Sequence, residues 1–212
     1  MLCRKQKDNY QNNREQQRNT NNPITNSIMK QSKNLFITAG HRGGNTGANA
    51  NGYSEAELAI QLRNDLTNKL HEQGVVVVND ADADNLTSVV NTINKNCTNR
   101  DLCLDLHFNS FSNASANGTE VLIQNSPTNM EIEFAEDVLN AVCSTLGTKN
   151  RGVKKEGKSQ YKRLAMLSGV KCNSVLLEVC FISSQSDMVR YESRYNELVE
   201  KMVIVIIKHI TQ

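Results

Sequence analysis

Residues 175–182 read VLLEVCFI, an apolar run broken only by Glu178. A continuous run of branched and aromatic residues is typical of a strand that is buried on both faces of a sheet. Similar runs occur at residues 35–39 (LFITA), 75–79 (VVVVN) and 102–109 (LCLDLHFN). Because amphipathic stretches separate these runs, the sequence predicts an α/β fold in which helices cover both faces of a mostly parallel, twisted sheet.

The remaining elements follow from shorter signals along the chain. Residues 119–124 predict one more strand. Ser54 and Glu57 have the spacing of a capping box, which marks the start of a helix, and Gly74 is suited to the end of that helix. Periodic apolar positions predict helices over residues 54–73, 86–95, 129–146, 187–191 and 195–210.

Composition restricts the classes of function. The 212 residues carry 24 Lys+Arg and 22 Asp+Glu, and a net charge of +2 gives no indication of nucleic-acid binding. No apolar run reaches the ~18 residues that a membrane span needs. The first residues are basic but no apolar stretch follows them, so we expect no secretory signal peptide and synthesis in the cytoplasm. Six cysteines without a CxxC pair predict free, mostly buried thiols.

Residues 1–33 differ from the rest of the chain. They are rich in Asn and Gln, and their basic side chains outnumber the acidic ones. Such a segment cannot bury enough apolar area to offset the loss of conformational entropy, so we expect a flexible basic tail ahead of a single domain over residues 34–212. The tail could be a solvated extension, or it could anchor the protein to a larger assembly or an anionic polymer.

Two ionisable residues stand close to the start of the predicted domain. His41 directly follows the first predicted strand, in the stretch GHRGGNTGANANG, which lacks both G-x-G-x-x-G and the ending of a P-loop. A nucleotide site is therefore not indicated, and the glycines instead permit tight bending of the backbone around His41. Glu55 lies in the first turn of the next helix, on the stripe that faces the sheet, although a carboxylate there also complements the helix dipole.

Two further ionisable residues lie within predicted strands. The period of two places Cys103, Asp105, His107 and Asn109 on one strand face. A histidine in this position is either a hydrogen-bonded core residue or a ligand. Glu178 has apolar neighbours, and an unpaired carboxylate among them costs several kcal/mol or takes up a proton. We therefore interpret Glu178 as a site residue in preference to a partner in a structural ion pair.

Taken together, these residue types predict a hydrolytic zinc site. Two histidines and one glutamate are a common donor set for a catalytic Zn²⁺, which keeps a further position for water. Zinc lowers the pKa of that water toward ~7. A second, desolvated carboxylate can accept the proton and pass it to a leaving amine.

Four ordered blocks of sequence contain these residues: ITAGHRGGNTGANANGYSEAEL, DLHFNSFSNASANGTEVLI, RGVK and VLLEVCFISSQSDM. They resemble the Gly-His-Gly-Gly opening, the Ser-x-His-x-Asn strand with its Gly-x-Glu, and the Val-Leu-x-Glu strand of a known family. The family is that of the zinc-dependent N-acetylmuramoyl-L-alanine amidases of the Amidase_3 type, which occur as bacterial autolysins and phage endolysins. The resemblance extends over residues 35–191.

This resemblance implies an enzyme that hydrolyses peptidoglycan. The implied reaction cleaves the amide between the lactyl group of N-acetylmuramic acid and L-alanine of the stem peptide. It also implies that His41, Glu55 and His107 bind Zn²⁺ and that Glu178 is the catalytic carboxylate. Candidates for substrate binding are Arg42, Asn51 and Asn109.

Asn79 and Asp80 stand where the family often has Thr-Arg after the second strand, and three further positions depart from the family pattern. Arg42 stands where a glycine is usual and could add a contact to an anionic substrate. Asp105 replaces a small residue and could orient His107 as an outer hydrogen-bond acceptor. Cys180 replaces a glycine on the predicted face of Glu178, where it could fill space or bring a thiol near the metal.

Two alternative functions remain open at the level of sequence. One is a zinc peptidase that cuts within the stem peptide. The other is a non-catalytic wall-binding or structural module, held in a larger assembly by the basic tail. In either case we expect the protein to act at the bacterial cell wall, and its features are consistent with a phage lysin.

Overall fold

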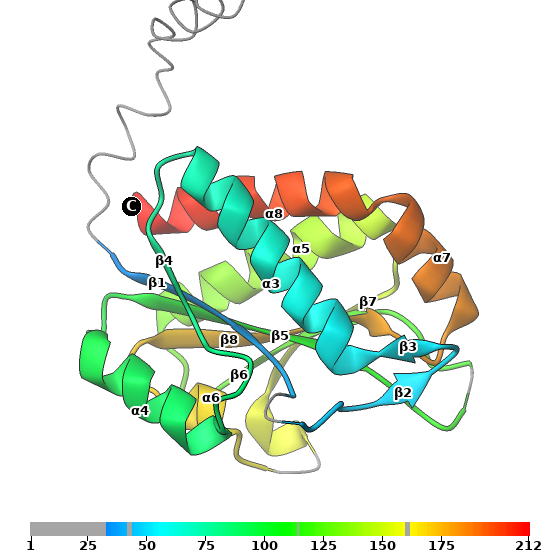
Figure 1. Ribbon diagram of the computed structural model, residues 1–212, viewed down its shortest axis with the longest axis horizontal. Helices are drawn as coiled ribbons and strands as arrows, with labels where there is room; N and C mark the ends of the chain where they lie inside the picture. The colour runs from blue at the N-terminus through cyan, green and yellow to red at the C-terminus, as the bar shows by residue number, and fades with distance from the viewer. Residues whose placement is uncertain (1–32, 42–43, 114, 160–161) are drawn as a thin grey trace, which may run out of the picture.

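A six-stranded sheet in the order β4-β1-β5-β8-β6-β7 forms the centre of the protein (Figure 1). The computed structural model describes residues 33–41, 44–113, 115–159 and 162–212. Neighbouring strands are parallel except for β6, which runs antiparallel to β8. The strands are β1 (Leu35–Ala39), β4 (Val77–Asn79), β5 (Leu102–Asn109), β6 (Thr119–Ile123), β7 (Asn150–Lys155) and β8 (Asn173–Phe181).

Helices cover both faces of this sheet. The long helices α3 (Glu55–Glu72), α5 (Asn129–Leu146) and α8 (Tyr195–Ile210) lie on one face, where α8 packs against both α3 and α5. On the opposite face lie α4 (Leu86–Asn96) and the short helix α6 (Ala165–Ser168) (Figure 1). The remaining elements are α7 (Gln185–Ser193), a 3₁₀ turn (Glu156–Lys158) and a small antiparallel hairpin of β2 (Asn49–Ala50) and β3 (Tyr53–Ser54). The predicted fold class is confirmed.

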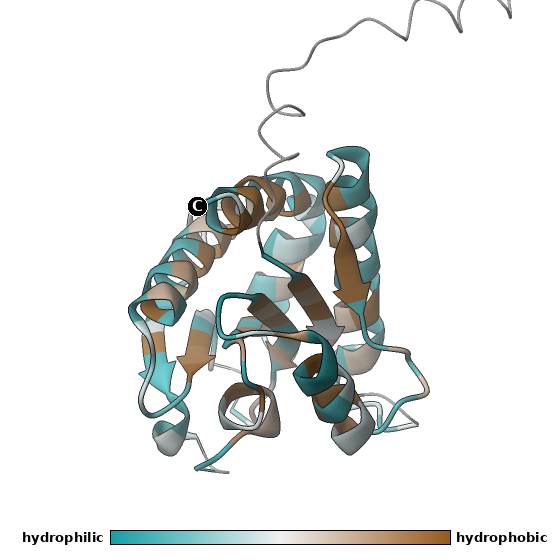
Figure 2. Ribbon diagram, turned by 90° about the vertical axis from the view of Figure 1, so that its left-hand side faces the viewer, coloured by the Kyte–Doolittle hydropathy of each residue, from teal (hydrophilic) through white to brown (hydrophobic). Residues whose placement is uncertain are grey.

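Alternating side chains of the strands divide the core into two parts. Leu102 and Leu104 of β5 belong to the main cluster beneath α3, α5 and α8. Cys103 between them packs instead with Phe36 and with Ile93 of α4. Figure 2 shows the apolar strands in brown between the helices. This alternation confirms the period of two in β5, which sets Asp105 and His107 apart from the leucines of the main core.

Two sequence predictions about local structure are wrong. Residues 75–79 do not form a fully buried strand, because β4 covers only Val77–Asn79 at the edge of the sheet and Val76, just before it, is 68% exposed. Ser54 is the N-cap residue of α3 but makes no capping hydrogen bond, so the predicted capping box with Glu57 is not formed. Its hydroxyl is directed instead to the carbonyl of Thr46. A capping box does form in α5, between Thr128 and Glu131.

The predicted tail falls almost entirely outside the described residues, since residues 1–32 are not among them. The boundary at residues 33 and 34 therefore stays a prediction. Lys33 is buried, and its ammonium donates a hydrogen bond to the carbonyl of His209 in α8 (2.9 Å). None of the helices in the described ranges has the length and apolar character that crossing a membrane requires.

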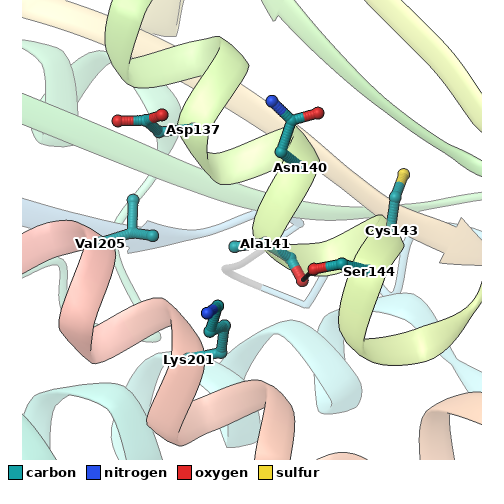
Figure 3. Close-up of a pocket in the computed structure, with 7 residues that line it drawn as sticks. All are labelled: Asp137, Asn140, Ala141, Cys143, Ser144, Lys201 and Val205. Carbon is teal, nitrogen blue, oxygen red and sulfur yellow. Dashed lines mark hydrogen bonds between the residues drawn. The ribbon is translucent and has the colours of Figure 1, made fainter.

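A shallow groove of about 600 Å³ lies between α5 and α8 (Figure 3). Its lining includes Asp137, Cys143, Lys201 and Val205. None of the residues predicted from sequence to take part in catalysis, metal binding or substrate binding is among the lining residues. The groove is therefore separate from the residues considered next.

Candidate metal centre

Three residues predicted as metal ligands meet at the carboxyl edge of the sheet. His41 directly follows β1, Glu55 is the first residue of α3, and His107 lies near the end of β5. Glu55 stands between the two rings, with Oε2 3.2 Å from His41 Nε2 and Oε1 3.0 Å from His107 Nδ1. Each residue offers one donor atom, and these atoms all lie within 4.8 Å of one another. The arrangement is close enough for a single metal ion to contact all three.

The Glu55 carboxylate is held by the backbone as well as by the histidines. Its Oε2 accepts a hydrogen bond from the amide of Ala48 (3.0 Å), and Oε1 accepts one from the amide of Phe108 (3.2 Å). Burial alone would raise the pKa of Glu55, but the contacts with His107, His41 and Ala48 outweigh burial and hold this pKa well below its ordinary value. The carboxylate is thus anionic at neutral pH and suited to a cation.

Two glycines let the backbone approach these rings. His41 itself adopts a left-handed conformation (φ 55°), and Gly47 does the same (φ 64°). A Cβ on Gly47 would lie 2.6 Å from Glu55 Oε2 and from the ring of His41, and a Cβ on Gly40 would collide with the ring of His107. The Gly-rich stretch therefore packs directly against the three donor residues, as the sequence predicts for the surroundings of His41.

His107 is enclosed by carboxylates on both sides of its ring. Its Nε2 lies 3.2 Å from Asp105 Oδ2, while Nδ1 faces Glu55. Burial alone would lower the pKa of His107, but Asp105 and Glu55 raise it well above its ordinary value. The outer contact between Asp105 and His107 that the sequence suggests is present.

The side chain of Glu178 projects from β8 beside His107. The two residues are paired in the register of the parallel strands β5 and β8, so their side chains project from the same face. The Oε2 atom of Glu178 is buried and has no hydrogen-bond partner among the described residues. Burial raises the pKa of Glu178 to about 7, although the neighbouring His107 opposes this shift. Such a group can gain and lose a proton near neutral pH.

A second carboxylate, Glu120, pairs with Glu178 from the other side, in antiparallel strand β6. It forms ion pairs with Arg151 (2.6 Å) and Lys154 (2.5 Å), which lower its pKa against the effect of burial. Asn109 also donates to Glu120 (3.3 Å). Sequence reasoning assigned no role to Glu120. The available signals were a lone carboxylate within the apolar run TEVLI and the basic residues of RGVK, which together could have indicated an ion pair.

The buried carboxyl of Glu178 predicts a pH-dependent stability of the metal-free protein. Between its ordinary value of 4.5 and about 7, the folded state keeps a proton that the unfolded state has released. The free energy of unfolding therefore falls as pH rises through this window, by about 3 kcal/mol if the whole shift is expressed. Glu178→Gln removes this titration.

The measurement is urea unfolding of both proteins in the presence of a chelator, from about pH 4.5 to about pH 7.5. We expect the variant to gain stability relative to the wild type as the pH rises. A difference between the two proteins that stays constant with pH would show that Glu178 has an ordinary pKa.

Two of the three residues predicted to bind substrate, Asn51 and Asn109, have other partners in this structure. Asn51 (φ 53°) donates from its side chain to the carbonyl of Ile182 (2.9 Å), which ties the β2–β3 hairpin to the end of β8. Asn109 contacts Glu120 and accepts a hydrogen bond from the amide of Ser110. Arg42 lies outside the described residues. A role of these residues toward substrate stays a prediction.

The placement of Cys180 beside Glu178 is wrong. The register between β5 and β8 shifts after His107, so that Asn109 pairs with Phe181. This irregularity breaks the period of two, and Cys180 is fully buried in the main core, with its sulfur 4.0 Å from that of Met188. Of the two alternatives for Cys180, the structure supports the filling of space.

Comparison with known proteins identifies the family. Residues 35–211 match the family model Amidase_3, described as N-acetylmuramoyl-L-alanine amidase. This range includes His41, Glu55, His107 and Glu178. The chain belongs to the Amidase_3 family.

This Amidase_3 chain is similar to several individual proteins. The uncharacterized protein YqiI of Bacillus subtilis (strain 168) is 31% identical over 157 residues, which are 73% of this chain and 73% of YqiI. The N-acetylmuramoyl-L-alanine amidase LytC of the same organism is 28% identical over 168 residues, 78% of this chain but 32% of LytC. An N-acetylmuramoyl-L-alanine amidase of Clostridium difficile 630 has the same fold, with a TM-score of 0.72 at 22% identity over 84% of this chain and 96% of that one.

Proposed function

We propose that this Amidase_3 chain is a zinc-dependent N-acetylmuramoyl-L-alanine amidase whose metal is held by His41, Glu55 and His107. As a member of its family, the protein is a peptidoglycan hydrolase that acts on an amide. The proposal for zinc is supported by one observation above all: two imidazole nitrogens and an anionic carboxylate converge within 4.8 Å. Nitrogen and carboxylate donors of this kind, three in number, are typical of catalytic zinc sites.

The substrate of the proposed reaction is the amide between the lactyl group of N-acetylmuramic acid and L-alanine. Zinc, when bound, supplies a Lewis acid that polarises the carbonyl of this amide and lowers the pKa of a water molecule. Glu178 serves as the general base, because its Oε2 accepts no hydrogen bond from any described residue and its pKa of about 7 suits proton uptake at neutral pH. The same carboxyl then donates this proton to the amine of L-alanine as the amide breaks.

The surrounding residues keep these groups in place. The amides of Ala48 and Phe108 fix both oxygens of Glu55, so that the carboxylate does not rotate away from the histidines. Arg151 and Lys154 hold Glu120 as an anion beside Glu178. This negative charge is one of the causes of the raised pKa of Glu178. The contacts of Glu55 thus keep its carboxylate anionic, and the charge of Glu120 helps to keep the pKa of Glu178 high enough for it to take up a proton.

The test is identification of the products that the purified protein releases from purified peptidoglycan. We expect mass spectrometry to find intact stem peptides with free L-alanine amino groups, together with glycan that carries free lactyl carboxylates. Treatment with a chelator should abolish release, and readdition of Zn²⁺ should restore it. Stem peptides cut internally would indicate a zinc peptidase, and zinc-independent wall binding without products would indicate a non-catalytic module.

We also propose that the protein acts at the cell wall, as a phage lysin or an autolysin. A second part of the proposal is that residues 1–33 attach the protein to a larger assembly. The membership of a peptidoglycan-hydrolysing family supports the first. The basic, Asn- and Gln-rich composition of residues 1–33 supports the second. Product release from intact cells, compared between the full chain and a variant that begins at residue 33, separates a contribution of the tail from that of the domain.

A further inference from the structure

Asp105 stands directly behind the ring of His107. The two residues lie two positions apart in β5 and therefore project from the same face of the strand. Asp105 Oδ2 is 3.2 Å from Nε2 of the ring, and Glu55 Oε1 is 3.0 Å from Nδ1 at the opposite side. Each nitrogen of the ring thus faces its own carboxylate.

Asp105 is itself fixed by a neighbouring strand. Its Oδ1 accepts a hydrogen bond from the hydroxyl of Thr38 (2.6 Å), and the two residues are paired in the register of β1 and β5. Thr38 and Asp105 are 2% and 1% exposed, so water does not compete for this contact. Because Thr38 occupies Oδ1, the other oxygen is directed toward His107.

When a metal ion is bound by the donor residues, this chain of contacts decides which nitrogen of His107 carries a proton. A neutral imidazole has one N–H and one lone pair, and an ionised carboxylate can only accept a hydrogen bond. In the metal-free protein both nitrogens face a carboxylate, so neither tautomer is favoured by these contacts alone. A metal ion held by Glu55 and the lone pair of Nδ1 would leave Asp105 as the acceptor on the ring, and the remaining proton then belongs on Nε2. Nδ1 is the nitrogen that faces Glu55, on the side where the three donor residues meet.

We propose that Asp105 is a positioning residue that keeps the His107 proton on Nε2 and directs Nδ1 to the metal, with Thr38 as the donor that fixes Asp105. The inference rests on the proposed function, because it requires His107 to be a metal ligand. Outer carboxylates of this kind fix the orientation of a ligand ring and increase its basicity. Asp105 therefore acts on metal binding without touching metal or substrate.

The first readout is zinc affinity, measured by competition with a chromophoric chelator, so that it does not depend on activity. We expect Asp105→Ala to bind Zn²⁺ about 10–100-fold more weakly than the wild type. Asp105→Asn keeps an acceptor oxygen but not the charge and should recover part of this loss. Thr38→Val leaves Asp105 in place and should cost less than Asp105→Ala.

The matched control is Asp101→Ala. Asp101 precedes the same strand, is 2% exposed, and accepts hydrogen bonds from the amides of Asn34 (2.7 Å) and Thr98 (2.6 Å), away from the donor residues. Its loss should lower the free energy of unfolding while zinc affinity stays at the wild-type value. A general effect of removing a buried carboxylate would instead weaken zinc binding in both variants.

The second readout is the imidazole Nε2–H of His107 in ¹⁵N-labelled, zinc-loaded protein. A hydrogen bond to Asp105 should give a proton resonance that is shifted downfield and protected from exchange in the wild type and lost in Asp105→Ala. Unchanged zinc affinity in Asp105→Ala and Asp105→Asn would overturn the inference while the proposed function stands. If Asp105→Ala does not fold, unchanged affinity in Thr38→Val and Asp105→Asn overturns it equally. A wild-type protein that binds no zinc would overturn the proposed function itself.

Discussion

Replacement of Glu178 by Gln is expected to lower the rate of peptidoglycan hydrolysis by about 10²–10⁴-fold while zinc stays bound. The amide has nearly the shape of the carboxylate, so the packing of β8 should persist. It cannot accept a proton from the attacking water, and the leaving amine loses its proton donor. The three donor residues are not altered, so metal content should equal that of the wild type. Rates of product release and metal analysis on the same preparation provide the measurement.

Glu131→Gln is the matched control for this substitution. Glu131 is also buried, and its carboxylate contacts the amide of Ser174 at the opposite end of β8 from Glu178. A glutamine can keep the capping role in α5, but it has one acceptor oxygen where both oxygens of Glu131 accept from Gln124, Thr128 and Ser174, so we expect some loss of stability and compare activities per folded protein. We expect this control to keep full activity. Near-wild-type activity of Glu178→Gln would remove Glu178 from the mechanism, even with zinc bound.

Replacement of His107 by Ala is expected to abolish zinc binding and activity together. The ring supplies one of the three donor atoms, so its loss should weaken zinc binding by more than the ~10–100-fold that removal of an outer partner costs. It also leaves Glu55 and Asp105 facing each other across the space of the ring, where their repulsion opposes any rearrangement that could replace the lost donor. Dialysis against Zn²⁺ followed by metal analysis measures the first effect, and product release the second.

His209→Gln is the control for the removal of a buried imidazole. His209 of α8 is 3% exposed and pairs with Asp137 of α5 (2.7 Å), away from the donor residues. We expect one equivalent of zinc and unaltered product release in this variant. Stoichiometric zinc in His107→Ala would contradict the assignment of His107 as a ligand and would require a different donor set.

The strands of the central sheet could be predicted because their signal is strong and local. The runs at residues 35–39 and 102–109 agree with β1 and β5 to the residue. The position of β4 at the edge of the sheet could not be predicted from VVVVN. The order of strands depends on the face of the sheet over which each connecting helix passes, and a single strand sequence does not contain that information. β7 was not predicted, since NRGVKK has the polar composition of an edge strand with one face in solvent.

The candidate site was predictable as a set of residues but not as a set of contacts. Histidines and glutamates at successive element ends indicated a common edge of the sheet, and the structure brings His41, Glu55 and His107 together there. The partner of Asp105 could not be identified, because Thr38 is distant in sequence and meets Asp105 only through the register of β1 and β5. Cys180 was misplaced because the run VLLEVCFI is apolar at almost every position, so its sequence shows no alternation from which the irregular step could be read.

Lys33 and the last turn of α8 lie together, joined by the hydrogen bond to His209, at the beginning of β1. His41 follows the other end of that strand, five residues long and thus about 16 Å across. Both ends of the described domain consequently leave the molecule at the amino edge of the sheet, remote from the donor residues (Figure 1). An affinity tag, a fusion partner or a covalent tether to a solid support can be attached at either end without obstructing the approach of a bulky polymer to the catalytic edge.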